Sequence, residues 1–126
     1  MQTVFDFGLA SPTSALFDLA TAIERNAIAW LALERGAQAV RIDIALALLE
    51  GYREVLPLPA ARVQLLADLL PLVHFDFALS EVEYFEGVTG SSANADVAYH
   101  TFLLGHAAWF QGPHGQVLRA VLHAAA

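Results

Sequence analysis

The residues with the clearest chemical potential lie near the amino end of the chain. Asp6 stands in the sequence VFDFG, after apolar and β-branched residues and just before Gly8. A carboxylate that ends a buried strand, beside a glycine that permits tight backbone geometry, suits a hard cation such as Mg²⁺. Three common residues also occur together by chance, so a strand that merely ends in an aspartate is the alternative interpretation.

The histidines have no spacing that indicates a metal site. Four of them lie in the C-terminal third: His100, His106, His114 and His123. A helical metal pair needs a spacing of three or four residues, whereas His100 and His106 are six apart. His74 and Asp76 are two apart and point to different faces of a helix. We therefore expect ordinary core or surface histidines.

The composition argues against nucleic-acid-binding proteins and membrane proteins. The 126 residues are 57% hydrophobic, include no cysteine and carry a formal charge of −7 with only six Lys and Arg. Nucleic-acid binding requires clustered cations, so we expect no nucleic-acid partner. No uncharged apolar run reaches the ~20 residues of a membrane span, so we expect no membrane and a cytoplasmic location.

The periodicity predicts one helical domain with a short strand. Alternating residues at Thr3–Phe7 indicate the strand, and apolar residues at three- and four-residue steps indicate helices. The expected helices span residues 15–34, 39–55, 60–87, 96–110 and 116–123. Pro71 should kink or divide the third helix, and the glycine-rich residues 87–95 should form a loop.

The stretch VFDFGLASPTSALFDLATAIERNAIAW resembles the superfamily of aminoglycoside phosphotransferases and homoserine kinases, which has the protein-kinase-like fold. In that family a strand ends in a metal-binding Asp, and a helix then begins near Asp-Leu-Ala. The matching positions here are Asp6 and the sequence Asp18-Leu19-Ala20, and LLEGYREVLPLP is also similar to the family. The resemblance implies the helical C-terminal subdomain of this fold, with one N-terminal strand.

The resemblance also implies roles for two carboxylates. Asp6 would coordinate the Mg²⁺ that bridges the phosphates of ATP. Asp18 would be a buried carboxylate that braces the backbone of the catalytic loop. The alternative for Asp18 is an aspartate in the first helical turn that complements the helix dipole.

The departures from the family pattern predict an inactive chain. In the family, a His-Gly-Asp…Asn catalytic loop and an ATP-binding lobe with its lysine precede the metal Asp, and five residues cannot contain them. We therefore expect residues 1–126 to be a truncated C-lobe of a kinase for small-molecule hydroxyl groups. We place no catalytic residue in this chain and expect it to bind neither Mg²⁺ nor ATP alone.

An unpaired apolar strand is a template for association. We therefore expect a homodimer through the N-terminal strand and the first helix. Two alternatives remain open: a split kinase completed by a separate N-terminal kinase-lobe chain, and a helical module for self-association or binding.

Overall fold

The computed structural model describes residues 14–126, which are mainly helical and contain no strand, only one isolated bridge between Ile28 and Val40. The predicted mainly-α class is therefore confirmed for this part of the chain. The predicted strand Thr3–Phe7 and the predicted metal ligand Asp6 lie outside the described residues.

Helix α1 spans Ala15–Ala27. Ser14 caps it, because the Ser14 hydroxyl accepts a hydrogen bond from the Phe17 amide at 3.1 Å. The prediction of a helix to residue 34 was wrong. The backbone becomes extended at Ile28, which forms an isolated antiparallel β-bridge with Val40. Two short 3₁₀ turns, together labelled η1 (Leu33–Ala39), lie in the loop that this bridge closes, and they are separated by a kink at Gly36, whose φ of 63° and ψ of −126° are not helical.

Helix α2 spans Ile42–Val55, close to its predicted range, and a proline-containing connector leads to α3 (Ala60–Glu83). Pro71 lies inside α3 without dividing it. Proline has no amide hydrogen, so the carbonyl of Ala67, four residues earlier, loses its usual donor. Arg119 Nε donates to that carbonyl at 3.3 Å and so supplies a replacement from another helix.

The predicted loop at residues 87–95 is much shorter in the structure. Helix α3 continues as a π-helix, η2 (Tyr84–Thr89), and the chain reverses at Gly90, whose φ is 65°. The next helical run consists of α4 (Ser92–Val97), η3 (Ala98–Gly105) and α5 (His106–Trp109). The Ser91 hydroxyl caps α4, and this cap starts the helix earlier than residue 96.

The last helix, α6, spans Pro113–Ala124 and also begins earlier than predicted. Pro113 occupies the first turn, where its missing amide hydrogen costs nothing. Gly115 in this turn packs so closely on the end of α5 that an added Cβ would lie 2.5 Å from Phe110 Cα.

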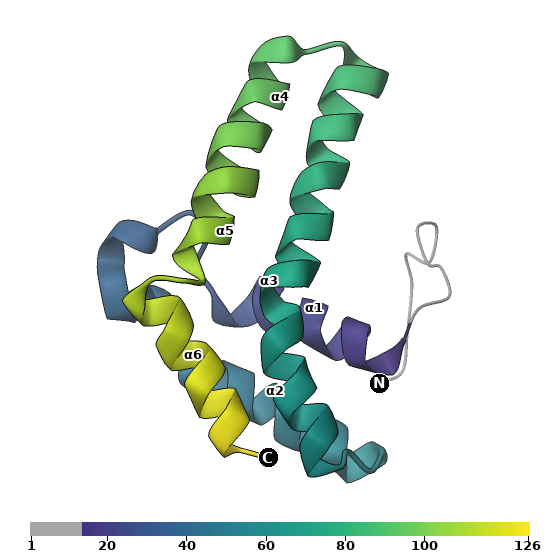
Figure 1. Ribbon diagram of the computed structural model, residues 1–126, viewed down its shortest axis with the longest axis vertical. Coiled ribbons are helices and arrows are strands. Elements are labelled where there is room, and N and C mark those ends of the chain that lie inside the picture. Colours follow the sequence, from purple (N-terminus) through teal and green to yellow (C-terminus); the bar gives the residue numbers. More distant parts are fainter. Residues whose placement is uncertain (1–13) are drawn as a thin grey trace, which may run out of the picture.

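The helices form a bundle from which a hairpin extends (Figure 1). Helices α1, α2, α6 and the first half of α3 pack together, while the rest of α3 runs antiparallel to α4 and η3. We call residues 72–105 the arm. The core of the bundle is apolar and includes Ile23, Leu49, Leu66, Leu70, Phe110, Leu118 and Leu122.

The arm exposes many large apolar side chains. These are Leu72, Phe75, Leu79, Tyr84, Val88, Val97, Tyr99 and Leu104. The helical run Ala60–Thr89 also has the length and composition of a membrane span. That resemblance is weak evidence for a membrane, because core helices of soluble proteins share it.

Candidate functional site

Of the two predicted site residues, only Asp18 lies among the residues that the structure describes, at the amino end of α1. Asp18 lies exposed in the first turn of α1, and among residues 14–126 its carboxylate forms no hydrogen bond or ion pair. This position favours a contribution to the helix dipole. The bracing role stays a prediction, because no catalytic loop occurs among the described residues.

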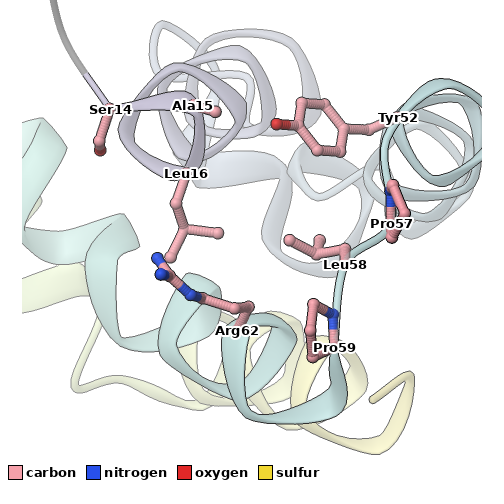
Figure 2. Close-up of a pocket in the computed structure, with 8 residues that line it drawn as sticks. All are labelled: Ser14, Ala15, Leu16, Tyr52, Pro57, Leu58, Pro59 and Arg62. Carbon is pink, nitrogen blue, oxygen red and sulfur yellow. The ribbon is translucent and has the colours of Figure 1, made fainter.

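A pocket of about 330 Å³ lies beside the same helix end (Figure 2). Eight residues line it: Ser14, Ala15, Leu16, Tyr52, Pro57, Leu58, Pro59 and Arg62. The Tyr52 hydroxyl points toward α1, and the Arg62 guanidinium extends toward Leu16. The pocket thus combines a phenol, a cation and an apolar floor formed by the connector between α2 and α3.

A second site is built around a buried ionisable pair. Glu24 on α1 and His74 on α3 are 1% and 2% exposed. Glu24 follows the apolar positions Ala20 and Ile23, and His74 follows Leu70 by one helical turn, so both side chains point into the core. His74 Nδ1 lies 2.6 Å from Glu24 Oε1, and His74 Nε2 lies 2.8 Å from the Phe102 carbonyl oxygen.

These contacts indicate how many protons the two side chains hold. A carbonyl oxygen only accepts, so His74 Nε2 carries a hydrogen. One more proton lies between His74 Nδ1 and Glu24. Arg25 Nε is 3.2 Å from Glu24 Oε2, the second oxygen of the same carboxylate. With one proton shared at the contact between His74 Nδ1 and Glu24, the pair carries no net charge.

Two aromatic rings complete the surroundings of His74. Trp30 stacks on His74 with centroids 4.2 Å apart and on His106 at 4.7 Å. The two imidazole centroids are only 5.5 Å apart, so both rings lie on one side of the indole. The Trp30 indole N–H donates to the Glu24 carbonyl at 3.2 Å, which anchors this turn to α1.

His106 is the unsatisfied member of the cluster. It is 8% exposed, and among residues 14–126 its buried Nδ1 has no hydrogen-bond partner. An unpaired buried polar atom costs about 1–3 kcal/mol. Burial lowers the pKa of His106 below its ordinary value, the nearby His74 lowers that pKa further, and Glu24 opposes the change. His106 is therefore neutral near pH 7.

A cavity of about 300 Å³ opens beside these groups. Its lining comes from α1, the following turn, α3, η3 and α5: Glu24, Arg25, Trp30, Leu31, His74, Phe77, Phe102 and His106. The Arg25 guanidinium lies 3.6 Å from the centroid of the Phe77 ring. Arg25 is partly exposed, with 44% of its side-chain surface accessible. The cavity thus has stacking walls and one accessible cation.

This cluster was not predicted from the sequence. The nearest polar neighbour of His74 along the chain is Asp76, whereas its actual partner, Glu24, lies fifty residues away. A signal was available, because Glu24 is a charged residue within the apolar stripe of α1. A buried charge needs a partner, and His74 occupies a comparable core position on α3.

Within residues 14–126, no three His, Asp or Glu side chains gather in an arrangement that could hold a metal ion. The predicted Mg²⁺ ligand, Asp6, lies outside this range. Comparisons with protein-family models, curated proteins and solved structures found no match to this chain.

Proposed function

We propose that this chain is the helical part of an ATP-dependent phosphotransferase that acts on a hydroxyl group of a small molecule. One observation carries the proposal: in the sequence from Val4 to Ala20, Asp6 at the end of the predicted strand, a short hydroxyl-rich segment and Asp18-Leu19-Ala20 follow one another in family order. The start of α1 at Ala15 supports it, because the family pattern requires a helix that begins near these three residues.

In phosphoryl transfer, this chain would have a supporting role. Phosphoryl transfer depends on positioning and on neutralisation of charge around the γ-phosphate. Asp6 would hold the Mg²⁺, and the exposed Asp18 would meet the backbone of a catalytic loop that another segment supplies. Without a base and an ATP-binding lysine, the residues of this chain give no useful rate.

The test begins with the DNA upstream of the Met1 codon. We expect an in-frame or neighbouring segment that encodes a His-Gly-Asp…Asn loop. This segment is expressed with the chain, and ADP release from Mg-ATP is measured with amino alcohols, hydroxy amino acids and aminoglycosides. The combined protein should be active, and residues 1–126 alone should neither release ADP nor bind Mg-ATP in calorimetric titration.

Asp6→Asn should lower the rate of the combined protein by at least about 100-fold, because it removes a ligand of the charge-neutralising metal. Asp96→Asn, at an exposed position of α4, is the matched control and should leave the rate unchanged. An unrelated upstream sequence, or full activity of the Asp6→Asn protein, would refute the proposal.

A helical association module is the second candidate function. The exposed apolar side chains of the arm favour it, since soluble monomers rarely expose large contiguous apolar surface. An upstream sequence without kinase features, together with self-association of the chain, would favour this candidate over the phosphotransferase.

A further inference from the structure

We propose that the cavity beside Glu24, His74 and His106 is a binding site for a small aromatic carboxylate. This inference is independent of the proposed phosphotransferase function. The cavity lies near the carboxyl end of α1, where Glu24 is six residues, or about 9 Å along the helix axis, from Asp18.

The size and lining of the cavity define the body of the ligand. About 300 Å³ is at the lower end of the volumes of small-molecule pockets, which suits one or two fused rings. Trp30, Phe77 and Phe102 contribute aromatic surface to the wall. Aromatic groups prefer offset-stacked or edge-to-face contacts with such side chains, so a planar ring fits this lining better than a flexible polar chain.

The charges define the polar end of the ligand. The buried Glu24–His74 pair has no net charge, and His106 is neutral, so Arg25 leaves the site with one net positive charge. Arg25 lines the cavity and keeps 44% of its side-chain surface accessible, so an anion bound in the cavity can pair with it. A guanidinium binds a carboxylate through paired N–H donors, which makes a carboxylate the matching group.

A second, independent feature points to a ligand. His106 lines the cavity, and its buried Nδ1 has no hydrogen-bond partner in the part of the chain that the structure describes. Buried polar atoms without partners are rare in folded proteins, and those that occur require an explanation. A small rotation of the His106 ring on binding would bring this nitrogen to a ligand hydroxyl or carboxyl group, which would supply the missing hydrogen bond.

Benzoate is the probe, and benzamide is its neutral counterpart of nearly the same shape. The indole N–H signal of Trp30 is followed by heteronuclear NMR during titration of the full chain with each compound. We expect benzoate to shift this signal saturably with a Kd on the order of 1 mM, as suits a ligand of this size. Benzamide should bind at least about five times more weakly.

Arg25→Gln should weaken benzoate binding by about tenfold, since it removes the one accessible cation of the site. Arg35→Gln is the matched control, because Arg35 is exposed in η1 and does not line the cavity. Far-UV circular dichroism verifies that both variants are folded. Three results would each overturn the proposal: no saturable shift up to about 10 mM benzoate, equal binding of benzamide, or unchanged affinity in the Arg25→Gln protein.

Discussion

At the scale of single residues, we expect the Glu24–His74 pair to be sensitive to substitution. Both side chains are buried, and removing either one takes away the other's short hydrogen bond. Burying two ionisable groups is expensive, so such a pair contributes little net stability, yet breaking it is costly. Removing one member of the pair should therefore cost more stability than replacing both.

We expect His74→Leu to lower the free energy of unfolding by about 3–5 kcal/mol, because it leaves the Glu24 carboxylate buried beside only Arg25. The double variant Glu24→Leu, His74→Leu should lose much less than the two single variants together. Urea denaturation measures these energies, and Asp76→Asn, at an exposed position of α3, is the control. A loss below about 1 kcal/mol for His74→Leu would contradict this account.

His106 makes stability depend on pH. Its pKa is lowered in the folded state, so below about pH 6.5 the unfolded chain binds more protons than the folded one. The free energy of unfolding therefore falls as the pH falls through this range. We expect the urea midpoint to decrease between about pH 7.5 and about pH 5.

The variant His106→Leu should reduce this pH dependence, because it removes the titrating group. His100→Gln, at an exposed position of η3, should retain it. Identical pH profiles for His106→Leu and the unchanged protein would assign the dependence to other groups.

At the scale of elements, Pro71 and Arg119 explain how α3 stays continuous. The proline deprives the Ala67 carbonyl of its donor, and Arg119 from α6 replaces that donor. The same guanidinium pairs with Asp68 at 3.1 Å. A local defect in one helix is therefore compensated by packing against another.

This compensation predicts a coupling between two substitutions. Arg119→Met should destabilise the protein, and its cost should shrink when Pro71→Ala restores the amide donor within α3. We expect a coupling of about 0.5–1.5 kcal/mol in the double-mutant cycle, measured by urea denaturation. Effects that add to within about 0.3 kcal/mol would show that Arg119 does not replace the lost hydrogen bond.

Two helical glycines provide a matched comparison. Gly115→Ala should destabilise by about 1–3 kcal/mol or more, because its Cβ would overlap the Phe110 and Trp109 backbone. Gly51→Ala in α2 should stabilise by about 0.5–1 kcal/mol, since nothing lies within 4 Å of the added Cβ. Thermal unfolding measures both, and effects of equal sign would refute the close contact between α5 and α6.

At the scale of the whole molecule, we expect the chain to associate with a second copy of itself. The predicted dimer interface consists of the N-terminal strand, which lies outside the described residues, and α1. The arm offers a second apolar surface. Two-fold dimers are the commonest soluble assemblies, so we expect a dimer at micromolar concentration in light scattering coupled to size-exclusion chromatography.

A variant on the arm distinguishes the two surfaces. Val88→Glu places a charge on a residue that is 74% exposed, and it should leave the dimer intact if the amino-terminal interface is the correct one. Loss of the dimer in this variant would assign association to the arm. A monomer in the unchanged protein would contradict the prediction of a dimer.

The sequence by itself determined the helical class and the approximate position of most helices. Apolar periodicity and capping residues are local signals, so α2 and most of α3 appeared where predicted. The carboxyl end of α1 and the start of α4 differed from their predicted positions. The Ile28–Val40 bridge and the chain reversal at Gly90 depend on tertiary contacts and turn geometry, which apolar periodicity does not report.

Only the tertiary structure decided which polar residues meet. Glu24, His74 and His106 lie on three helices, and the partner of each is fixed by how those helices pack. The same holds for Arg119, which reaches the carbonyl freed by Pro71 across the bundle. Helical periodicity states which face of a helix is buried, whereas the identity of the opposing face arises from the fold as a whole.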